Sequence, residues 1–215
     1  LGRTEGITIF APAALEQILT TIFKATGDRL VFPFVVIPLE MDREEIVLED
    51  ETIRITAFPL NHRVPTFGFK FKEKFRRLKV NVAAVKDGAI NPIHLQTLVT
   101  GRDVELLDGS VLRYEDFTLP SPKARVFSYC TDTAPFKGLK DYLRETTTLY
   151  HEATFLMNKK DRAKKTFHST AADAGKLAQE LGVKKLLMGH FSGRYNDSKA
   201  HLEEARLHFN QELFA

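Results

Sequence analysis

The chain lacks most of the features that would place it outside the soluble globular class. It has no tryptophan and a single cysteine, Cys130, among 215 residues, so an internal disulfide is excluded. A fold without disulfides depends on its core and suits a reducing compartment, and we therefore expect a cytoplasmic protein. No apolar run approaches the roughly 18 residues that span a bilayer. Hydrophobic residues make up 43% of the chain, which excludes a disordered or fibrous class.

The chain also has little excess charge of either sign, since 31 Lys and Arg residues nearly balance 28 Asp and Glu residues and leave a formal net charge of +3. The exception is local: the stretch FKFKEKFRRLK, residues 69–79, holds six of the 31 Lys and Arg residues and three phenylalanines. Two interpretations remain open. A basic face with aromatic side chains can follow a phosphate backbone. Alternatively, this is an edge strand whose Phe67, Phe69 and Phe71 point inward, while its lysines point outward and prevent edge-to-edge pairing.

Hydrophobic periodicity divides the first third of the chain into short elements. The patterns predict strands at 7–11, 31–39 and 52–60. Between the first two, Pro12 suits a first helical position. Apolar residues then recur at helical spacing, at Leu15, Ile18, Leu19, Ile22 and Phe23.

The middle of the chain loses this regularity. A strand pattern runs from Phe67 to about Phe75, and between residues 75 and 109 we recognise only a short helix at 92–99. Segments of this length without regular structure are usually functional projections or disordered loops. We therefore interpret 75–109 as an insertion into a single domain.

Strands and helices alternate after Pro120. The predicted strands are 125–130, 147–152 and 184–190, and the predicted helices are 136–145, 170–182 and 198–214. Such alternation is typical of an α/β protein in which helices pack on a sheet.

Polar residues suited to metal binding or proton transfer follow several of these strands. Asp132, Glu152 and His190 stand at the ends of the later strands, and His62 follows strand 52–60. In layered α/β folds, ligands bind beyond the carboxyl ends of the strands, and imidazole with carboxylate suits zinc or a similar metal. Alternatively, each residue is only hydrogen-bonded where a strand meets its loop. The pattern alone does not decide between these interpretations.

His168 precedes a helix rather than following a strand. Ser169 and Thr170 come next, with Asp173 three residues after Thr170 in a capping-box pattern. This pattern predicts that His168 lies beside a helix N-terminus. His151, the neighbour of Glu152, is interpreted equally well as a packing residue or as a catalytic residue.

Five segments carry a resemblance to a known family: NHRVPTFGF, SYCTDT, YHEATF, FHSTAADA and GHFSGRY. In the sequence, Asp132 lies 70 positions after His62, His168 lies 36 positions after Asp132, and His190 lies 22 positions after His168. In order and spacing these segments resemble the motifs of ribonuclease Z, the endonuclease family that trims tRNA precursors at their 3′ ends. The resemblance covers essentially the whole chain. It implies an α/β metallo-β-lactamase fold, an αββα sandwich with an inserted arm.

The resemblance also implies roles for individual residues. His62 would bind one zinc ion, His190 would bind a second, and Asp132 would bridge the two. Two such ions polarise a phosphoryl group and activate a water molecule. His168, oriented by Glu152, would protonate the leaving oxygen, which suits a group with a pKa near neutral pH.

The same resemblance implies contacts with precursor tRNA. Arg194 and Ser192 match the end of the last motif, although this chain reads SGRY where the family has SSRY. Residues 75–109 stand where the family carries its tRNA-binding arm, and the resemblance implies backbone contacts there by Lys79, Lys86 and Arg102. Where bacterial arms are rich in Gly and Pro, this one reads DGAINPIHLQ. Family members often form homodimers, so we expect one here.

One family signature is absent from the sequence. H-x-H-x-D-H supplies most of the metal ligands in ribonuclease Z, and the seven histidines here never occur in that arrangement. We therefore expect this chain, taken alone, to bind metal weakly and to be inactive, and to expose apolar surface. The chain does not begin with methionine, which favours a missing N-terminal segment over a non-catalytic RNA-binding relative. A metallo-β-lactamase-fold hydrolase of small phosphodiesters is the other alternative.

Overall fold

The computed structural model of the protein describes residues 3–27, 31–40, 42–74, 77–85, 90–120 and 123–215. The chain divides into two compact units, which are described separately. The first unit comprises Leu1–Glu49, Ile55–Phe71 and Val126–Ala215, and the second comprises Asp50–Arg54 and Lys72–Arg125. None of the helices in the described residues is both long and apolar enough to cross a bilayer.

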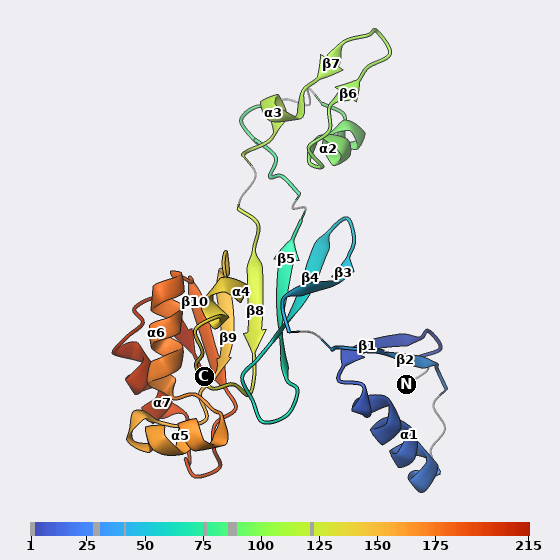
Figure 1. The fold of residues 1–215 in the computed structure, drawn as a ribbon. Coiled ribbons are helices and arrows are strands. Elements are labelled where there is room, and N and C mark those ends of the chain that lie inside the picture. Colours follow the sequence, from blue (N-terminus) through green and yellow to red (C-terminus); the bar gives the residue numbers. More distant parts are fainter. Residues whose placement is uncertain (1–2, 28–30, 41, 75–76, 86–89, 121–122) are drawn as a thin grey trace. The chain divides into compact units, whose positions relative to one another are not determined.

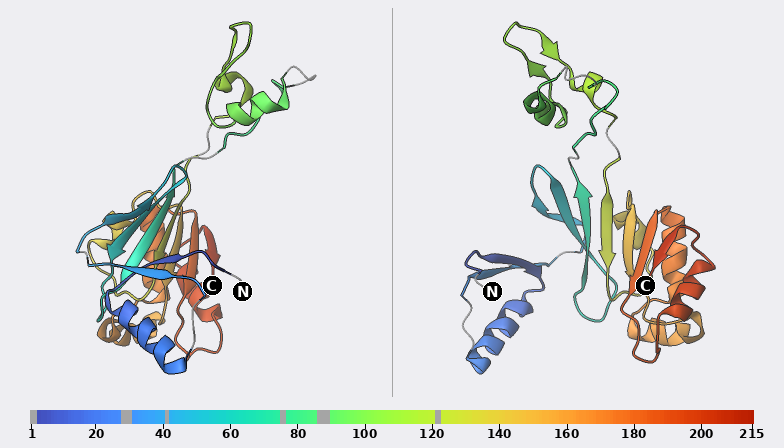
Figure 2. Two further views of the ribbon diagram at one scale, coloured as in Figure 1. Left: turned by 90° about the vertical axis from the view of Figure 1, so that its right-hand side faces the viewer. Right: turned by 180° about the vertical axis from the view of Figure 1, so that it is seen from behind.

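A seven-stranded sheet is the main element of the fold, with the strand order β11-β10-β9-β8-β5-β4-β3 (Figures 1 and 2). The strands are β3 (Glu45–Glu49), β4 (Ile53–Pro59), β5 (Phe67–Glu73), β8 (Val126–Cys130), β9 (Thr148–Glu152), β10 (Lys185–Gly189) and β11 (Glu212–Phe214). The last four are parallel. Their carboxyl ends therefore lie along one edge of the sheet, as the alternating pattern predicts.

Helices cover one face of this sheet and enclose the core with it. They are α4 (Leu139–Tyr142), α5 (Lys160–Thr166) after the 3₁₀ turn η2 (Met157–Lys159), α6 (Ala171–Leu181) and α7 (Lys199–Arg206). The core joins α6 alanines to strand residues such as Cys130, Leu149 and Leu186, all fully buried. The predicted capping box is confirmed, since Thr170 Oγ1 accepts from Asp173 N–H and Asp173 accepts from Thr170 N–H.

The predicted helix 198–214 is wrong in its second half. The helix α7 ends at Arg206, and residues 212–214 form the strand β11 beside β10. After the chain leaves the helix, Phe209 is buried in the core and Leu213 packs against it. The predicted helix 136–145 is likewise reduced to the four residues of α4.

The edge-strand interpretation of residues 67–75 is also wrong, because β5 lies between β8 and β4 inside the sheet. Phe67 is buried and Phe71 packs against Phe127, as expected of inward side chains. The lysines, however, do not all point into water. Lys70 is only 13% exposed, pairs with Glu44 at 2.6 Å and donates to the Tyr142 carbonyl at 2.8 Å.

The chain begins with a parallel strand pair and one helix, namely β1 (Ile7–Ala11), α1 (Ala14–Thr26) and β2 (Phe34–Pro38). The predicted strands here are confirmed, but α1 begins at Ala14, so Pro12 precedes the helix. No residue of α1 is buried, and Ile18 and Ile22 on its apolar face are about half exposed. Apolar side chains of α1 are therefore exposed, whereas the apolar surface expected from the sequence belongs to the sheet core and stays a prediction.

The second unit contains most of the irregular middle segment. Its elements are α2 (Pro92–Leu98), β6 (Val104–Glu105), β7 (Val111–Leu112) and α3 (Tyr114–Phe117). The short helix predicted at 92–99 is present, and Asn91 Oδ1 caps it by accepting from Ile93 N–H. This unit extends to Arg125, beyond the insertion expected at 75–109.

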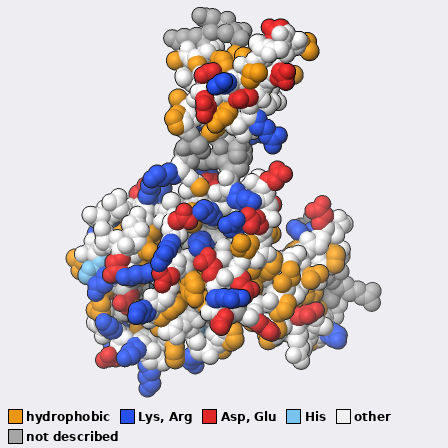
Figure 3. All heavy atoms as spheres, turned by 45° about the horizontal axis from the view of Figure 1, so that its top comes forward, with side chains coloured by type: hydrophobic (Ala, Val, Ile, Leu, Met, Phe, Trp, Pro, Cys, Tyr) orange, Lys and Arg blue, Asp and Glu red, His pale blue; other side chains and the backbone are white. Residues whose placement is uncertain are grey.

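Charges of both signs mix on the face drawn in Figure 3. Several lysines and arginines form ion pairs, for example Arg125 with Glu73 and Lys185 with Glu212. Among the described residues drawn in this view, positive and negative side chains are interspersed, so a binding site for nucleic acid has to be argued from particular residues.

Candidate active site

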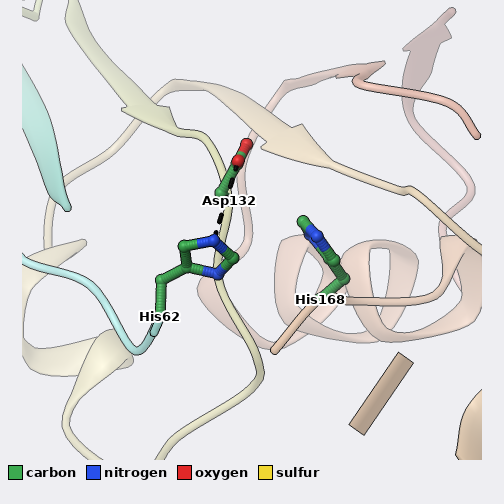
Figure 4. A group of neighbouring side chains, drawn as sticks. All are labelled: His62, Asp132 and His168. Atoms are coloured by element: carbon green, nitrogen blue, oxygen red, sulfur yellow. Dashed lines mark ion pairs between the residues drawn. The ribbon is translucent and has the colours of Figure 1, made fainter. Parts of the chain in front are cut away.

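Five predicted site residues meet beyond the carboxyl ends of the strands. Asp132 lies two residues after β8, Glu152 ends β9, and His190 follows β10 directly. His62 comes from the loop after β4, and His168 from the turn between α5 and α6. Figure 4 shows His62, Asp132 and His168 reaching one place from three separate segments.

Asp132 lies between two imidazoles. Its Oδ1 is 3.2 Å from His190 Nε2, and its Oδ2 is 4.0 Å from His62 Nε2. Partial burial acts to raise the pKa of Asp132, but a hydrogen bond from Thr131 and the charges of His190 and His168 outweigh it. The pKa therefore lies below its ordinary value, and at neutral pH the carboxylate is ionised with one oxygen toward each ring.

The other ring nitrogen of each of these histidines has its own partner. His62 Nδ1 lies 3.1 Å from the carbonyl oxygen of Phe167, and His190 Nδ1 lies 2.8 Å from Thr154 Oγ1. A carbonyl only accepts, so His62 carries its proton on Nδ1 and leaves Nε2 free to act as a ligand. Partners of this kind fix the ring orientation of metal-binding histidines.

Left-handed backbone occurs at two of these positions. Phe167 and His190 both have φ near +59°, a backbone conformation that residues other than glycine rarely adopt. At Phe167 this conformation ends α5 just before His168, and the Phe167 carbonyl is bonded to His62. Strain of this type concentrates at functional sites.

Glu152 forms the second centre of the site. Its side chain is fully buried and accepts from the N–H groups of Thr133 at 3.0 Å and Thr154 at 2.9 Å. Its Oε1 also lies 2.7 Å from His168 Nδ1. Because a carboxylate accepts, His168 holds a proton on Nδ1 and directs its Nε2 away from Glu152.

The residues present fit a metal centre. One ligand atom each from His62, Asp132 and His168 lie within 4.8 Å of one another, and so do atoms of Glu152, His168 and His190. Both Glu152 oxygens already have protein partners. Among the described residues, the ligand set implied by the resemblance, His62, Asp132 and His190, is not itself one of these two groups, although both histidines lie beside Asp132. Two imidazole nitrogens and a carboxylate match the donors that zinc prefers. Three donors do not complete two metal sites.

The remaining predicted residues lie elsewhere. Ser192 and Arg194 follow His190 on an exposed loop, where Arg194 donates to Ser192 Oγ at 3.1 Å. Lys79 and Arg102 belong to the second unit, and Lys86 lies outside the described residues. His151 is buried, its Nδ1 lies 2.7 Å from the Glu152 carbonyl, and burial lowers its pKa. It is therefore a neutral residue behind the site.

The structure adds residues that the sequence patterns missed. Thr154 Oγ1 and the Phe167 carbonyl contact His190 Nδ1 and His62 Nδ1 and so orient these two rings. A pocket of about 260 Å³ beside His168 is lined by Ala134, Pro135, Lys160, Ala163, Lys164 and Asp173. Lys160 and Lys164 stand four residues apart on α5, so they lie on the same face of the helix, about one turn apart. This spacing was the sequence signal that could have predicted two lysines beside the pocket.

Over 215 residues the chain is 34% identical to Ribonuclease Z of Porphyromonas gingivalis, a match that covers all of this chain and 71% of that protein. The chain belongs to the ribonuclease Z family. No protein-family model matches it. Among solved structures, human tRNase Z, short form, is similar with a TM-score of 0.58 and 21% identity, over 87% of this chain and 61% of that one. The metallo-β-lactamase fold protein YhfI of Bacillus subtilis has a TM-score of 0.57 and 15% identity, over 97% and 61%. The predicted metallo-β-lactamase fold is thereby confirmed.

Proposed function

We propose that this chain is part of a cytoplasmic, zinc-dependent endoribonuclease that cleaves precursor tRNA at its 3′ end. The observation that supports the proposal is the Glu152–His168 pair beside the three donors His62, Asp132 and His190. Membership of the ribonuclease Z family supports the substrate.

Each residue then has one task in the reaction. Zinc, held by His62, Asp132 and His190, would polarise the phosphoryl group and lower the pKa of a bound water. Water adds to phosphorus as hydroxide after its proton has passed to solvent, and the bond to the 3′ oxygen of the tRNA body breaks. His168 gives its Nε2 proton to that oxygen, while Glu152 holds the ring by Nδ1. The tRNA body leaves with a 3′-hydroxyl and the trailer keeps the phosphate.

This chain taken alone would bind zinc weakly and would not turn over. The three residues that would hold zinc would be divided between two ions, whereas a single catalytic zinc normally has three protein ligands and a water. The missing donors would come from an H-x-H-x-D-H segment, which this sequence does not contain.

Positive charges at two places would hold the RNA. Arg194 and Ser192 lie next to His190, and Lys160 and Lys164 border the pocket beside His168. The second unit would act as the tRNA-binding arm through Lys79 and Arg102, as part of a homodimer. Such contacts follow the phosphate backbone and carry no sequence information themselves.

Cleavage of precursor tRNA by the product of the complete reading frame, with zinc added, tests this function. We expect activity from that product, none from the 215-residue chain, and a loss of roughly 10²–10⁴-fold in His168→Ala. His208→Ala, just after α7 in the first unit, is the matched control. Equal rates for His168→Ala and the unaltered protein would contradict the proton-donor role. Hydrolysis of a small phosphodiester without cleavage of precursor tRNA would favour the alternative hydrolase.

A further inference from the structure

Glu204 on the helix α7 binds, through its carboxylate, two backbone N–H groups in the segments that carry the site residues. Glu204 Oε2 accepts from Met157 N–H at 2.8 Å, and its Oε1 accepts from the N–H groups of Met157 and Ala172, both at 3.0 Å. The residue itself is half-buried and stands about 50 residues from Met157 in sequence. Neither contact belongs to the reaction proposed above.

The two amides that Glu204 binds begin two helical segments. Met157 is the first residue of the turn η2, which leads into α5, and Ala172 lies in the first turn of α6. N–H groups at such positions have no partner within their own helix, and a negative charge there is stabilising. One carboxylate therefore holds the starts of both segments.

Between these segments the chain forms a short parallel pairing. Phe155 pairs with Thr170: Phe155 N–H donates to the Ser169 carbonyl at 3.2 Å, and Ala171 N–H donates to the Phe155 carbonyl at 2.9 Å. Two residues after Phe155 and Thr170 come Met157 and Ala172. Glu204 therefore accepts hydrogen bonds from both segments just beyond this pairing.

The catalytic pair lies at the opposite end of the same pairing. Glu152 precedes Phe155 by three residues and His168 precedes Thr170 by two. A slip of one segment against the other would change the 2.7 Å separation of Glu152 Oε1 and His168 Nδ1. A misplacement of about 1 Å can cost roughly 100-fold in rate.

We propose that Glu204 is a positioning residue that sets the geometry of the Glu152–His168 pair by fixing the backbone of both segments. A second contact from the same side supports the arrangement, since Leu156 N–H donates to the hydroxyl of Tyr195 at 3.1 Å. The catalytic part of this inference rests on the proposed ribonuclease function, whereas the structural part does not.

Amide hydrogen exchange in this chain tests the structural part without any activity. In Glu204→Ala we expect the amides of Met157, Phe155 and Ala172 to lose at least about tenfold in protection. Met157 and Ala172 lose their bonds to a charged acceptor, and the neighbouring bond from Phe155 N–H to the Ser169 carbonyl loosens with them. The amides of β10 should stay protected. Glu204→Gln keeps one acceptor oxygen and should restore part of the protection. Glu203→Ala, the exposed neighbour on α7, is the control.

A uniform loss of protection over the whole chain would overturn the proposal, because it would mean that Glu204 only adds global stability. Unchanged protection at Met157 and Ala172 would overturn it as well. If Glu204→Ala does not fold, Glu204→Gln is compared with the unaltered chain by the same criteria.

Kinetics in the product of the complete reading frame tests the catalytic part. Glu204→Gln should lower kcat on precursor tRNA by about tenfold or more and leave KM unchanged, since no RNA contact is removed. A variant with local loss of protection but an unchanged kcat would overturn the positioning role. If the unaltered protein does not cleave precursor tRNA, the proposed function fails, and the exchange result still decides whether Glu204 fixes the two segments.

Discussion

Glu152 and His168 form the central contact of the site, with Oε1 of the buried carboxylate 2.7 Å from Nδ1 of the imidazole. The same carboxylate accepts two backbone N–H groups, so it cannot turn toward another partner. It therefore determines which nitrogen of His168 is directed away from Glu152 and, in the proposed reaction, toward the substrate.

Replacing this carboxylate by an amide tests the contact. We expect Glu152→Gln to lower kcat on precursor tRNA by about 10- to 100-fold, less than the roughly 10²–10⁴-fold expected for loss of His168, because the proton donor remains but is poorly oriented. Steady-state kinetics on the product of the complete reading frame measures this. Glu203→Gln, on the exposed side of α7, is the control. A normal kcat in Glu152→Gln would show that His168 needs no orienting partner.

Thr154 offers a test of the metal centre that leaves every ligand in place. Its hydroxyl is 2.8 Å from His190 Nδ1, and Thr154→Val removes that partner with little change of volume. Loss of such partners typically weakens metal affinity by about 10–100-fold. Isothermal titration of zinc into the product of the complete reading frame measures it, with Thr21→Val on α1 as the control. Equal affinities would argue against His190 as a ligand.

His201 makes the stability of the chain depend on pH. It is fully buried between Phe191 and Tyr195, and burial lowers its pKa, although the charges of Glu204 and Asp197 act in the opposite direction. The unfolded chain takes up this proton near pH 6.5, and the folded chain only at lower pH. Stability therefore falls as the pH falls below about 6.5.

The variant His201→Phe should reduce the dependence of stability on pH, because it removes the imidazole that takes up a proton on unfolding. Urea unfolding at pH 7.5 and 5.5 measures the change, and a shallower loss of stability than in the unaltered chain is expected. Some dependence should remain, since burial lowers the pKa of His151 too. An unchanged slope in His201→Phe would contradict this assignment, and His94→Phe is the control.

Gly175 permits the close contact of α6 and α7. A β-carbon there would lie 2.7 Å from the backbone oxygen of Ala205 and 3.2 Å from its α-carbon. Gly175→Ala should destabilise the chain by about 1–3 kcal/mol, as overpacking does. Gly193→Ala is the matched control, because a β-carbon at Gly193 has no neighbour within 4 Å. Denaturant unfolding of both variants decides, and equal stability would contradict the packing argument.

The proposed tRNA-binding role of the second unit can be tested by the salt dependence of RNA binding. If Lys79 and Arg102 contact phosphates, each change to Ala should lower the slope of log affinity against log salt by about 1. Fluorescence anisotropy with labelled precursor tRNA measures the slope, and Lys24→Ala on α1 is the control. Slopes equal to that of the unaltered protein would mean that these charges are only solvated.

The sequence predicts the later strands and the strand-end residues well, for a physical reason. Parallel strands have their carboxyl ends on one edge, so Asp132, Glu152 and His190 meet once β8, β9 and β10 pair. Strand β11 was missed because its three residues gain their conformation from pairing with β10 and not from local propensity.

Partners that act through the backbone are not readable from side-chain patterns. The Phe167 carbonyl that holds His62 depends on a left-handed turn at a phenylalanine, which no propensity predicts. Glu204 likewise reaches Met157 and Ala172 only because α6 and α7 pack together. The interior place of β5 was also unavailable, since alternation alone does not distinguish an edge from a central strand.

The chemistry of the product ends is the most direct test of the proposed function. Precursor tRNA cut by the zinc-loaded product of the complete reading frame should yield a tRNA body with a 3′-hydroxyl and a trailer with a 5′-phosphate, and His168→Ala should give little of either. A 3′-phosphate or cyclic phosphate on the tRNA body would contradict attack by water with His168 protonating the 3′ oxygen.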